Sequence, residues 1–186
     1  KMILEKIRST VESFNLNISE KEILNHLKNT KRWPQSYPWG QSSVEIINNI
    51  GTQSANFFKA HVYTNQCYLD FDKWYRYYDL GYTTIISNIF DLNDGLRELS
   101  HKLTDMTGMS LNGNFYFSKP GQIASFNGHT HNYNVIVKQI YGESKWVVGD
   151  KDINLKPQKA LIVPSMSVHK VVTKMNKKLS LTINID

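Results

Sequence analysis

The sequence predicts an α+β protein that is mainly β, with helices in its first part and a β-sandwich or barrel in its second. Apolar residues recur at helical spacing before residue 110, whereas short apolar or alternating runs separated by turn residues follow from residue 112 onward. The 186 residues contain no repeat, low-complexity tract or break in composition that would mark a linker. We therefore expect a single domain.

Two helices are marked by their ends as well as by their spacing. Ser19 and Glu22 form a capping-box pattern ahead of apolar residues that recur at helical spacing. Farther along, Asp91 or Asn93 can cap a second helix, whose leucines recur at i, i+3 and i+7 until Gly108 ends it. Both are expected to be scaffold helices rather than sites.

The second half of the chain holds the strand signals. The expected strands are 114–117, 133–137, 144–148, 160–163 and 179–185. Turn residues separate them at 119–121, 141–142, 149–150 and 176–178. Strands joined by such short turns form a sandwich or barrel, and we expect the helices to pack on its outside.

Composition argues against several classes of protein. The formal net charge is +6, but the lysines are scattered and their densest group, 174–178, falls in an expected turn, which disfavours nucleic-acid binding. The single cysteine, Cys67, excludes an internal disulfide and fits the cytoplasm. Apolar stretches such as 161–164 are far shorter than the roughly 20 residues that span a bilayer. No membrane partner is expected.

Histidines form the most informative pattern. His129 and His131 are two residues apart, so on an extended strand both imidazoles point to the same side and can chelate a metal. His169 stands at the end of the apolar stretch 161–168, where antiparallel closure can bring it opposite the pair. The other histidines, which lie in segments without a second ligand nearby, are His26, His61 and His101.

Residues 128–146, Gly-His-Thr-His-Asn-Tyr-Asn-Val-Ile-Val-Lys-Gln-Ile-Tyr-Gly-Glu-Ser-Lys-Trp, resemble the core of the JmjC and ribosomal-oxygenase-like cupin hydroxylases. In that family a metal-binding His-x-Asp precedes a strand that ends in Gln, a tight turn at Gly and a strand with a Trp-like position. Gln139, Gly142 and Trp146 fall at these offsets from the first histidine. Residues 155–169 resemble the family's stretch that leads to its last metal histidine.

The resemblance covers roughly residues 80–186 and implies a double-stranded β-helix, the cupin or jelly-roll barrel, with N-terminal helices packed outside. It implies one cupin-like domain over 1–186. Residues 1–110 would be a helical and irregular flank with an outer strand at 81–88, and residues 111–186 would be the barrel core that carries the metal ligands.

The chain departs from the family at two positions that bear on chemistry. His131 stands where the family has a carboxylate ligand, which turns a two-histidine, one-carboxylate triad into three imidazoles and makes the site one unit more positive. Ser144 stands where ribosomal-oxygenase-like members hold the far carboxylate of 2-oxoglutarate with a lysine. Lys145 follows but should point to the opposite face of its strand. The remaining candidates for holding a carboxylate are Asn114, Tyr116, Ser144 and Thr182.

These features favour a mononuclear non-haem Fe(II) oxygenase that uses O2, acts on a small molecule or a protein, and takes 2-oxoglutarate as co-substrate if it is a hydroxylase. His131 and Ser144 leave open a three-histidine dioxygenase that binds its substrate directly. Three imidazoles also suit Zn, Cu, Ni or Mn, so a non-catalytic cupin with a structural metal is a further interpretation. The last is a protein-binding module that uses the aromatic segments 33–39 and 74–78.

Overall fold

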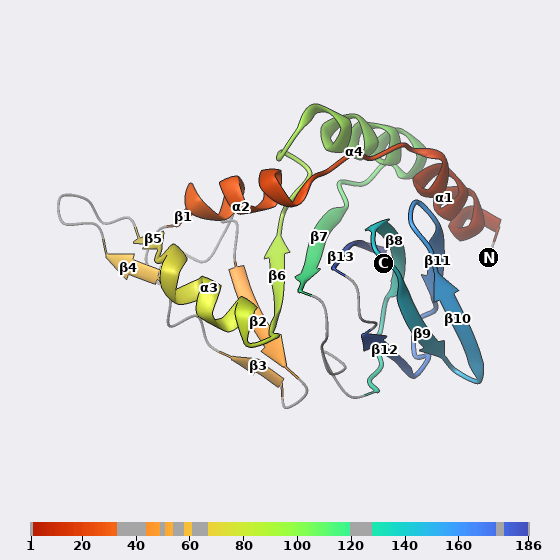
Figure 1. The fold of residues 1–186 in the computed structure, drawn as a ribbon. Helices are drawn as coiled ribbons and strands as arrows, with labels where there is room; N and C mark the ends of the chain where they lie inside the picture. Colours follow the sequence, from red (N-terminus) through yellow and green to blue (C-terminus); the bar gives the residue numbers. More distant parts are fainter. Residues whose placement is uncertain are drawn as a thin grey trace.

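The structure is a computed structural model, which describes residues 2–32, 44–48, 51–53, 58–60, 67–119, 128–173 and 177–185. The helices within these ranges are α1 (Met2–Ser13), α2 (Glu20–Lys28), α3 (Phe71–Asp79) and α4 (Asp94–Thr107). Figure 1 shows α1 and α4 lying over the strands of the C-terminal half. No helix among the described residues is both long and apolar enough to cross a membrane.

The described strands form three sheets. The seven-stranded sheet has the order β11 (Ala160–Val163), β8 (Asn134–Tyr141), β13 (Lys178–Ile185), β7 (Asn112–Ser118), β6 (Thr83–Ser87), β2 (Val44–Asn48) and β3 (Gly51–Gln53). The second sheet has the order β10 (Lys151–Leu155), β9 (Ser144–Val148) and β12 (His169–Thr173). The third, a flank, has the order β1 (Lys31–Arg32), β5 (Cys67–Leu69) and β4 (Phe58–Ala60).

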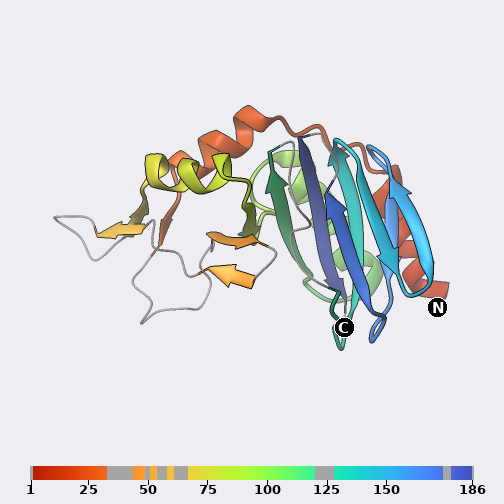
Figure 2. The same cartoon turned by 60° about the horizontal axis from the view of Figure 1, so that its bottom comes forward.

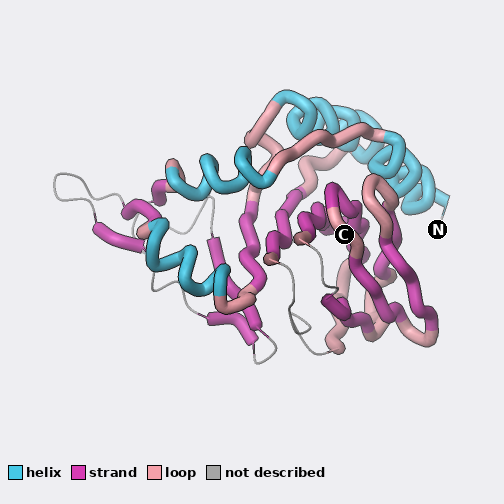
Figure 3. Tube along the Cα trace, in the orientation of Figure 1, coloured by secondary structure: helices cyan, strands magenta, loops and turns pink. Residues whose placement is uncertain are grey.

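All strand pairings in the first two sheets are antiparallel, and the two sheets form the walls of a double-stranded β-helix (Figure 2). This confirms the predicted fold class, mainly β with an α+β composition and a jelly-roll barrel. Helix α1 packs on the outer face of β8 and β11 and contacts α4, and the tube in Figure 3 shows these two helices together at one edge of the strands. The expectation of helices outside the barrel is therefore confirmed.

Strand β13 separates two hydrophobic cores. Its odd-numbered side chains, Leu179, Leu181 and Ile183, are fully buried in the core beneath the helices, together with Ile136 of β8 and Phe115 of β7. Its even-numbered side chains face the barrel interior, because alternate residues of a strand point to opposite faces. The interior core between the two sheets is formed by Val135, Val137, Trp146, Val148, Leu155, Leu161, Val163 and Val171.

A buried lysine fixes α1 to the large sheet. Lys138 on β8 is fully buried, and its ammonium group donates hydrogen bonds to the backbone carbonyls of Val11 (2.8 Å), Glu12 (3.0 Å) and Phe14 at the C-terminal end of α1. These carbonyls have no intrahelical partner, and a cation suits the negative end of a helix. Burial lowers the pKa of Lys138 to about 8.

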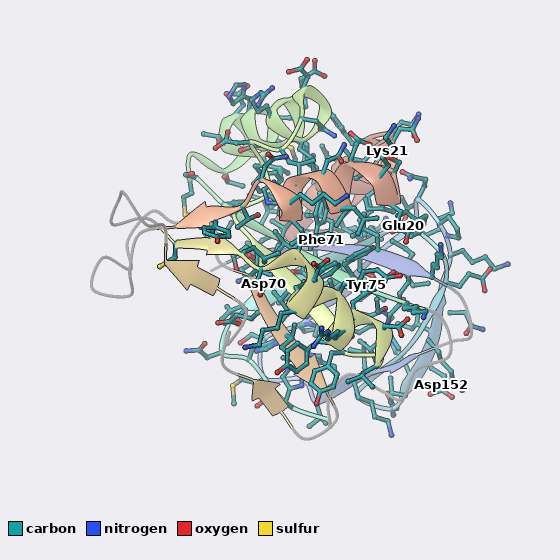
Figure 4. The ribbon with its side chains drawn as sticks, turned by 60° about the vertical axis from the view of Figure 1, so that its left-hand side comes forward. Glu20, Lys21, Asp70, Phe71, Tyr75 and Asp152 are labelled. Atoms are coloured by element: carbon teal, nitrogen blue, oxygen red, sulfur yellow. The ribbon has the colours of Figure 1, made fainter. Side chains whose placement is uncertain are left out.

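Helix α3 covers the outer face of β6 and β7. Trp74 is fully buried, donates from Nε1 to Thr84 Oγ1 at 3.0 Å and stacks on Phe117 at 6.3 Å. Phe71 and Tyr75, both labelled in Figure 4, stack at 6.1 Å, and each ring also contacts Trp74. The aromatic segment 74–78 thus serves packing in part, while the segment 33–39 lies outside the described residues.

The predicted helix ends are confirmed. Ser19 and Glu22 form the capping box of α2, Asn93 is the N-cap of α4, and Gly108 ends α4 with a φ of 71°. The predicted strands correspond to β7, β8, β9, β11 and β13, and the outer strand to β6. Of the predicted turns, residues 120–121 and 176 lie outside the described residues.

Several elements were not predicted individually, namely the helices α1 and α3 and the strands β1 to β5, β10 and β12. Lys151–Leu155 forms β10 although it exposes polar residues on most positions, because it is an edge strand beside β9. His169 was expected to end a strand, but β11 already stops at Val163, a turn follows, and His169 begins β12. Helix α3 was missed because its aromatic residues hid the helical spacing.

We predict that Lys138→Met lowers the free energy of unfolding by about 2 kcal/mol, because it leaves buried carbonyls of α1 without a donor. Urea denaturation at pH 7 measures the change. Lys145→Met is the control, since Lys145 is 42% exposed and pairs loosely with Asp152 at 3.6 Å, as the expected outward orientation requires. Equal losses in the two variants would contradict the anchoring role.

Candidate metal centre

The structure brings together the three predicted histidines. His129, His131 and His169 place one ring nitrogen each within 4.8 Å of the others. The Nε2 atoms of His129 and His131 lie 3.2 Å apart, and the ring centroids of the three residues are separated by 4.3 to 4.7 Å. Within the described ranges, this is the cluster of potential metal ligands.

Backbone hydrogen bonds hold the three ligands in place. His129 and His169 form an antiparallel bridge in which each backbone N–H donates to the other residue's carbonyl at 3.0 Å. The backbone N–H of Met166 donates to the carbonyl of His131 at 2.7 Å. These backbone hydrogen bonds join the turn before β12 to both ends of the His-x-His segment. The backbone therefore brings the three histidines together.

The donor set fits a divalent metal. Metal–nitrogen bonds of 2.0–2.1 Å place two ligand nitrogens about 3.0–3.4 Å apart in facial or tetrahedral geometry, and the 3.2 Å between His129 and His131 lies in this range. His169 Nδ1 lies 3.0 Å from the Ser167 carbonyl, which can only accept, so Nδ1 carries the proton and Nε2 keeps its lone pair.

Electrostatics favour the neutral form of two of the imidazoles, those of His131 and His169. Burial, together with repulsion from His169 and His129, lowers the pKa of His131 to about 4. Burial also lowers the pKa of His169, partly offset by the Ser167 carbonyl. Both rings are therefore unprotonated at pH 7, which is the form that binds metals. Tyr133 stacks on His131 at 4.8 Å and supports its ring.

A cavity of about 220 Å³ opens beside the histidines, between the two sheets. All three histidines line it. Three of the four residues predicted to hold a carboxylate, Asn114, Tyr116 and Thr182, line it as well. Further lining residues that the sequence analysis did not single out are Glu45, Thr83, Ile85, Ser87, Tyr133, Val135, Val137, Val163, Val171, Lys178, Ser180 and Asn184.

Ser144, the fourth predicted residue, lies deeper in the barrel wall. It is fully buried, donates to Gln139 Oε1 at 2.8 Å and accepts from Trp146 Nε1 at 3.0 Å. Ser180 donates to the same Gln139 oxygen at 2.9 Å. The family landmarks Gln139 and Trp146 therefore engage the hydroxyl of Ser144 in structural hydrogen bonds. The binding roles assigned to the four residues stay predictions.

Tyr116 is placed to donate a hydrogen bond inside the cavity. Burial, with the nearby Tyr133 and Glu45, raises the pKa of its phenol to about 12. The group is therefore protonated at neutral pH, where a phenol O–H can donate to an acidic ligand.

The remaining histidines lie apart from the centre. His101 is exposed on α4, and His26 is half-buried on α2, where burial lowers its pKa. His61 lies outside the described residues. His101 therefore provides a matched control for substitutions in the triad.

Comparison with known proteins finds similar structures but no similar sequence. Neither a family model nor a curated protein matches the sequence. Among solved structures, the Escherichia coli ribosomal oxygenase YcfD superposes on 94% of this chain with a TM-score of 0.61 and 15% identity. The chain therefore shares its fold with this structure.

Other YcfD structures superpose equally well. The complex with cobalt and succinic acid gives a TM-score of 0.60 at 14% identity, and the complex with cobalt and 2-oxoglutarate gives 0.58 at 14% identity, each over 94% of this chain. The chain spans 45% of the length of YcfD. The likeness is one of fold, and it confirms the double-stranded β-helix that the family resemblance implied.

We predict that the protein binds one equivalent of Zn²⁺ and that His129→Ala or His169→Ala weakens this binding by more than about 100-fold, because losing a ligand costs more than losing a supporting hydrogen bond. Competition with a chromophoric chelator measures the affinity. His101→Ala should bind Zn²⁺ as the unaltered protein does. Unchanged affinity in either triad variant would refute the site.

Proposed function

We propose that this protein is a mononuclear metal-dependent oxygenase, with Fe(II) held by His129, His131 and His169. The observation that carries the proposal is the arrangement of three imidazoles on one wall of a polar cavity. Three ligands on one side leave positions of the metal facing the cavity, which oxygenases of this type need. The ribosomal-oxygenase fold supports the same conclusion.

Each lining group has a task in this scheme. Bound Fe(II) would supply the activation of O2. The imidazoles hold the metal, and the stacked Tyr133 keeps His131 oriented. Tyr116, Asn114 and Thr182 offer hydrogen bonds to an acidic ligand from β7 and β13. The apolar interior core behind Trp146 excludes water from that side.

We favour a hydroxylase that uses 2-oxoglutarate. In that reaction 2-oxoglutarate and O2 yield succinate and CO2, one oxygen atom enters the new carboxylate of succinate, and the other enters the C–H bond of the substrate. The landmarks around the triad and the fold shared with YcfD, which has been crystallised with 2-oxoglutarate, support this choice. We propose a small molecule or a protein side chain as substrate.

A second candidate is a three-histidine dioxygenase whose substrate binds the metal directly. Two observations favour it: His131 replaces a carboxylate ligand, and the hydroxyl of Ser144 is engaged by Gln139 and Trp146. A structural zinc site would instead call for a fourth protein ligand, and the described residues offer three in the cluster.

We predict succinate formation when the protein is loaded anaerobically with Fe(II), mixed with 2-oxoglutarate and exposed to O2. His129→Ala should abolish it, whereas His101→Ala should retain it. Succinate is quantified by chromatography and O2 by an electrode. Oxygen uptake that needs no 2-oxoglutarate but does need an added chelating substrate would favour the second candidate.

We also predict that His131→Asp raises Fe(II) affinity relative to Zn²⁺, because a carboxylate neutralises part of the metal charge and is a harder ligand than imidazole. The ratio of the two dissociation constants, measured anaerobically, tests this. If the variant and the unaltered protein have the same ratio, residue 131 does not set the metal preference.

A further inference from the structure

Two lysines are buried in the large sheet, and they differ in their partners. Lys138 points to the outer face and donates to three carbonyls of α1. Lys178, at the start of β13, is 4% exposed and lines the metal cavity. Among the described residues, none accepts a hydrogen bond from Lys178 or forms an ion pair with it. Burial lowers its pKa to about 8, so at pH 7 it carries a charge.

Ser118, the residue opposite Lys178, likewise has a hydroxyl with no hydrogen-bond partner among the described residues. Ser118 pairs with Lys178 across β7 and β13, and its hydroxyl is buried without a hydrogen bond in the described part of the structure. Residues directly opposite on antiparallel strands hold their side chains about 5 Å apart on the same face. A buried cation and a buried hydroxyl without partners are costly unless something fills the space between them.

The backbone fixes the place of this pair. Gly142, in the turn between β8 and β9, has a φ of 71°, and a Cβ there would overlap the carbonyl oxygen of Lys177. Glycine at this position lets the turn press against the first residues of β13. The position of the Lys178 backbone is therefore fixed. Its side chain lies on the interior face of β13, the face that also carries Ser180 and Thr182.

We infer that Lys178 is the cationic anchor for a carboxylate of the ligand that binds at the metal, with Ser118 as a second donor. The anchor would lie on β13, whereas the family resemblance places a lysine at the position of Ser144 on β9. This inference rests on the proposed function, because it assigns the second carboxylate of a 2-oxo dicarboxylic acid whose first end lies at the histidines. The three histidines and Lys178 line the same cavity, so one ligand can reach both.

The chemistry of the groups selects a carboxylate. An ammonium and a hydroxyl side by side both donate, so their ligand must accept at more than one point and carry negative charge. A neutral ligand would leave the ammonium buried without a counter-charge. A monocarboxylic 2-oxo acid, whose far end is aliphatic, would also leave the Lys178 ammonium without a counter-charge.

The test compares two ligands that differ at the far end. Titration calorimetry on the Zn²⁺-loaded protein, which does not turn over, measures 2-oxoglutarate and 2-oxovalerate, whose far carboxylate is replaced by a methyl group. Lys178→Met should weaken 2-oxoglutarate binding about 10- to 100-fold, as expected for a lost charge-assisted hydrogen bond. Binding of 2-oxovalerate and of Zn²⁺ should stay as it was. Lys145→Met, which removes an exposed lysine of β9, should change neither.

Thermal unfolding of the metal-free protein gives an independent readout. Lys178→Met should raise the melting temperature by about 3 °C or more, because it removes a buried charge without a partner. Glutarate, which has no 2-oxo group to bind a metal, should stabilise the unaltered protein and leave Lys178→Met unchanged.

The outcomes separate the two proposals. If Zn²⁺ fails to bind but glutarate still stabilises the protein through Lys178, the metal-dependent function is wrong and the anchor stands. If Zn²⁺ and 2-oxoglutarate bind, and Lys178→Met binds 2-oxoglutarate as tightly as the unaltered protein, the anchor is wrong and the metal centre stands. If Ser118→Ala weakens 2-oxoglutarate binding less than Lys178→Met does, that result supports Ser118 as the second donor.

Discussion

The alternation of side chains along β13 is the constraint on which the rest of the structure depends. This strand is hydrogen-bonded on both sides, to β7 and to β8, so it cannot rotate to change which side chains face inward. Its apolar residues fill the core under the helices. Its polar residues, Lys178, Ser180, Thr182 and Asn184, must therefore line the barrel interior. The large sheet thus presents a polar wall where a barrel without a ligand would be packed with apolar side chains.

The three histidines lie on the small sheet, opposite that polar wall. The backbone bridge between His129 and His169 ties the His-x-His segment to β12, and Trp146 on the neighbouring β9 stacks near His169 with ring centroids 6.3 Å apart. The three histidines proposed to bind a metal therefore rest on one sheet, and the groups proposed to bind an acidic ligand rest on the other. Anything held by both would join the two walls of the barrel.

The sequence was informative where a local rule decides the outcome. The caps of α2 and α4, the strands between tight turns and the histidine spacing each follow from neighbouring residues. It was less informative about Lys178, which was assigned to a turn with its neighbouring lysines, because alternation predicts two faces of a strand but not which face is interior. Ser144 illustrates the same limit: its inward orientation followed from the pattern, but its engagement with Gln139 and Trp146 depends on contacts between strands.

Charge balance connects the two departures from the family pattern. With His131 in place of the family's carboxylate ligand, the charge of a divalent metal bound as proposed would be uncompensated, and Lys178 adds one further positive charge to the same cavity. Among the described residues that line it, Glu45 contributes a negative charge, from an exposed position on β2. A dianion with one carboxylate at the metal and one at Lys178 would bring the cavity close to neutrality, whereas a monoanion would leave a net positive charge in a low-dielectric interior. The arrangement therefore favours a dicarboxylate over a monocarboxylate on electrostatic grounds, even though the residues that provide this preference are not those that the family pattern suggests.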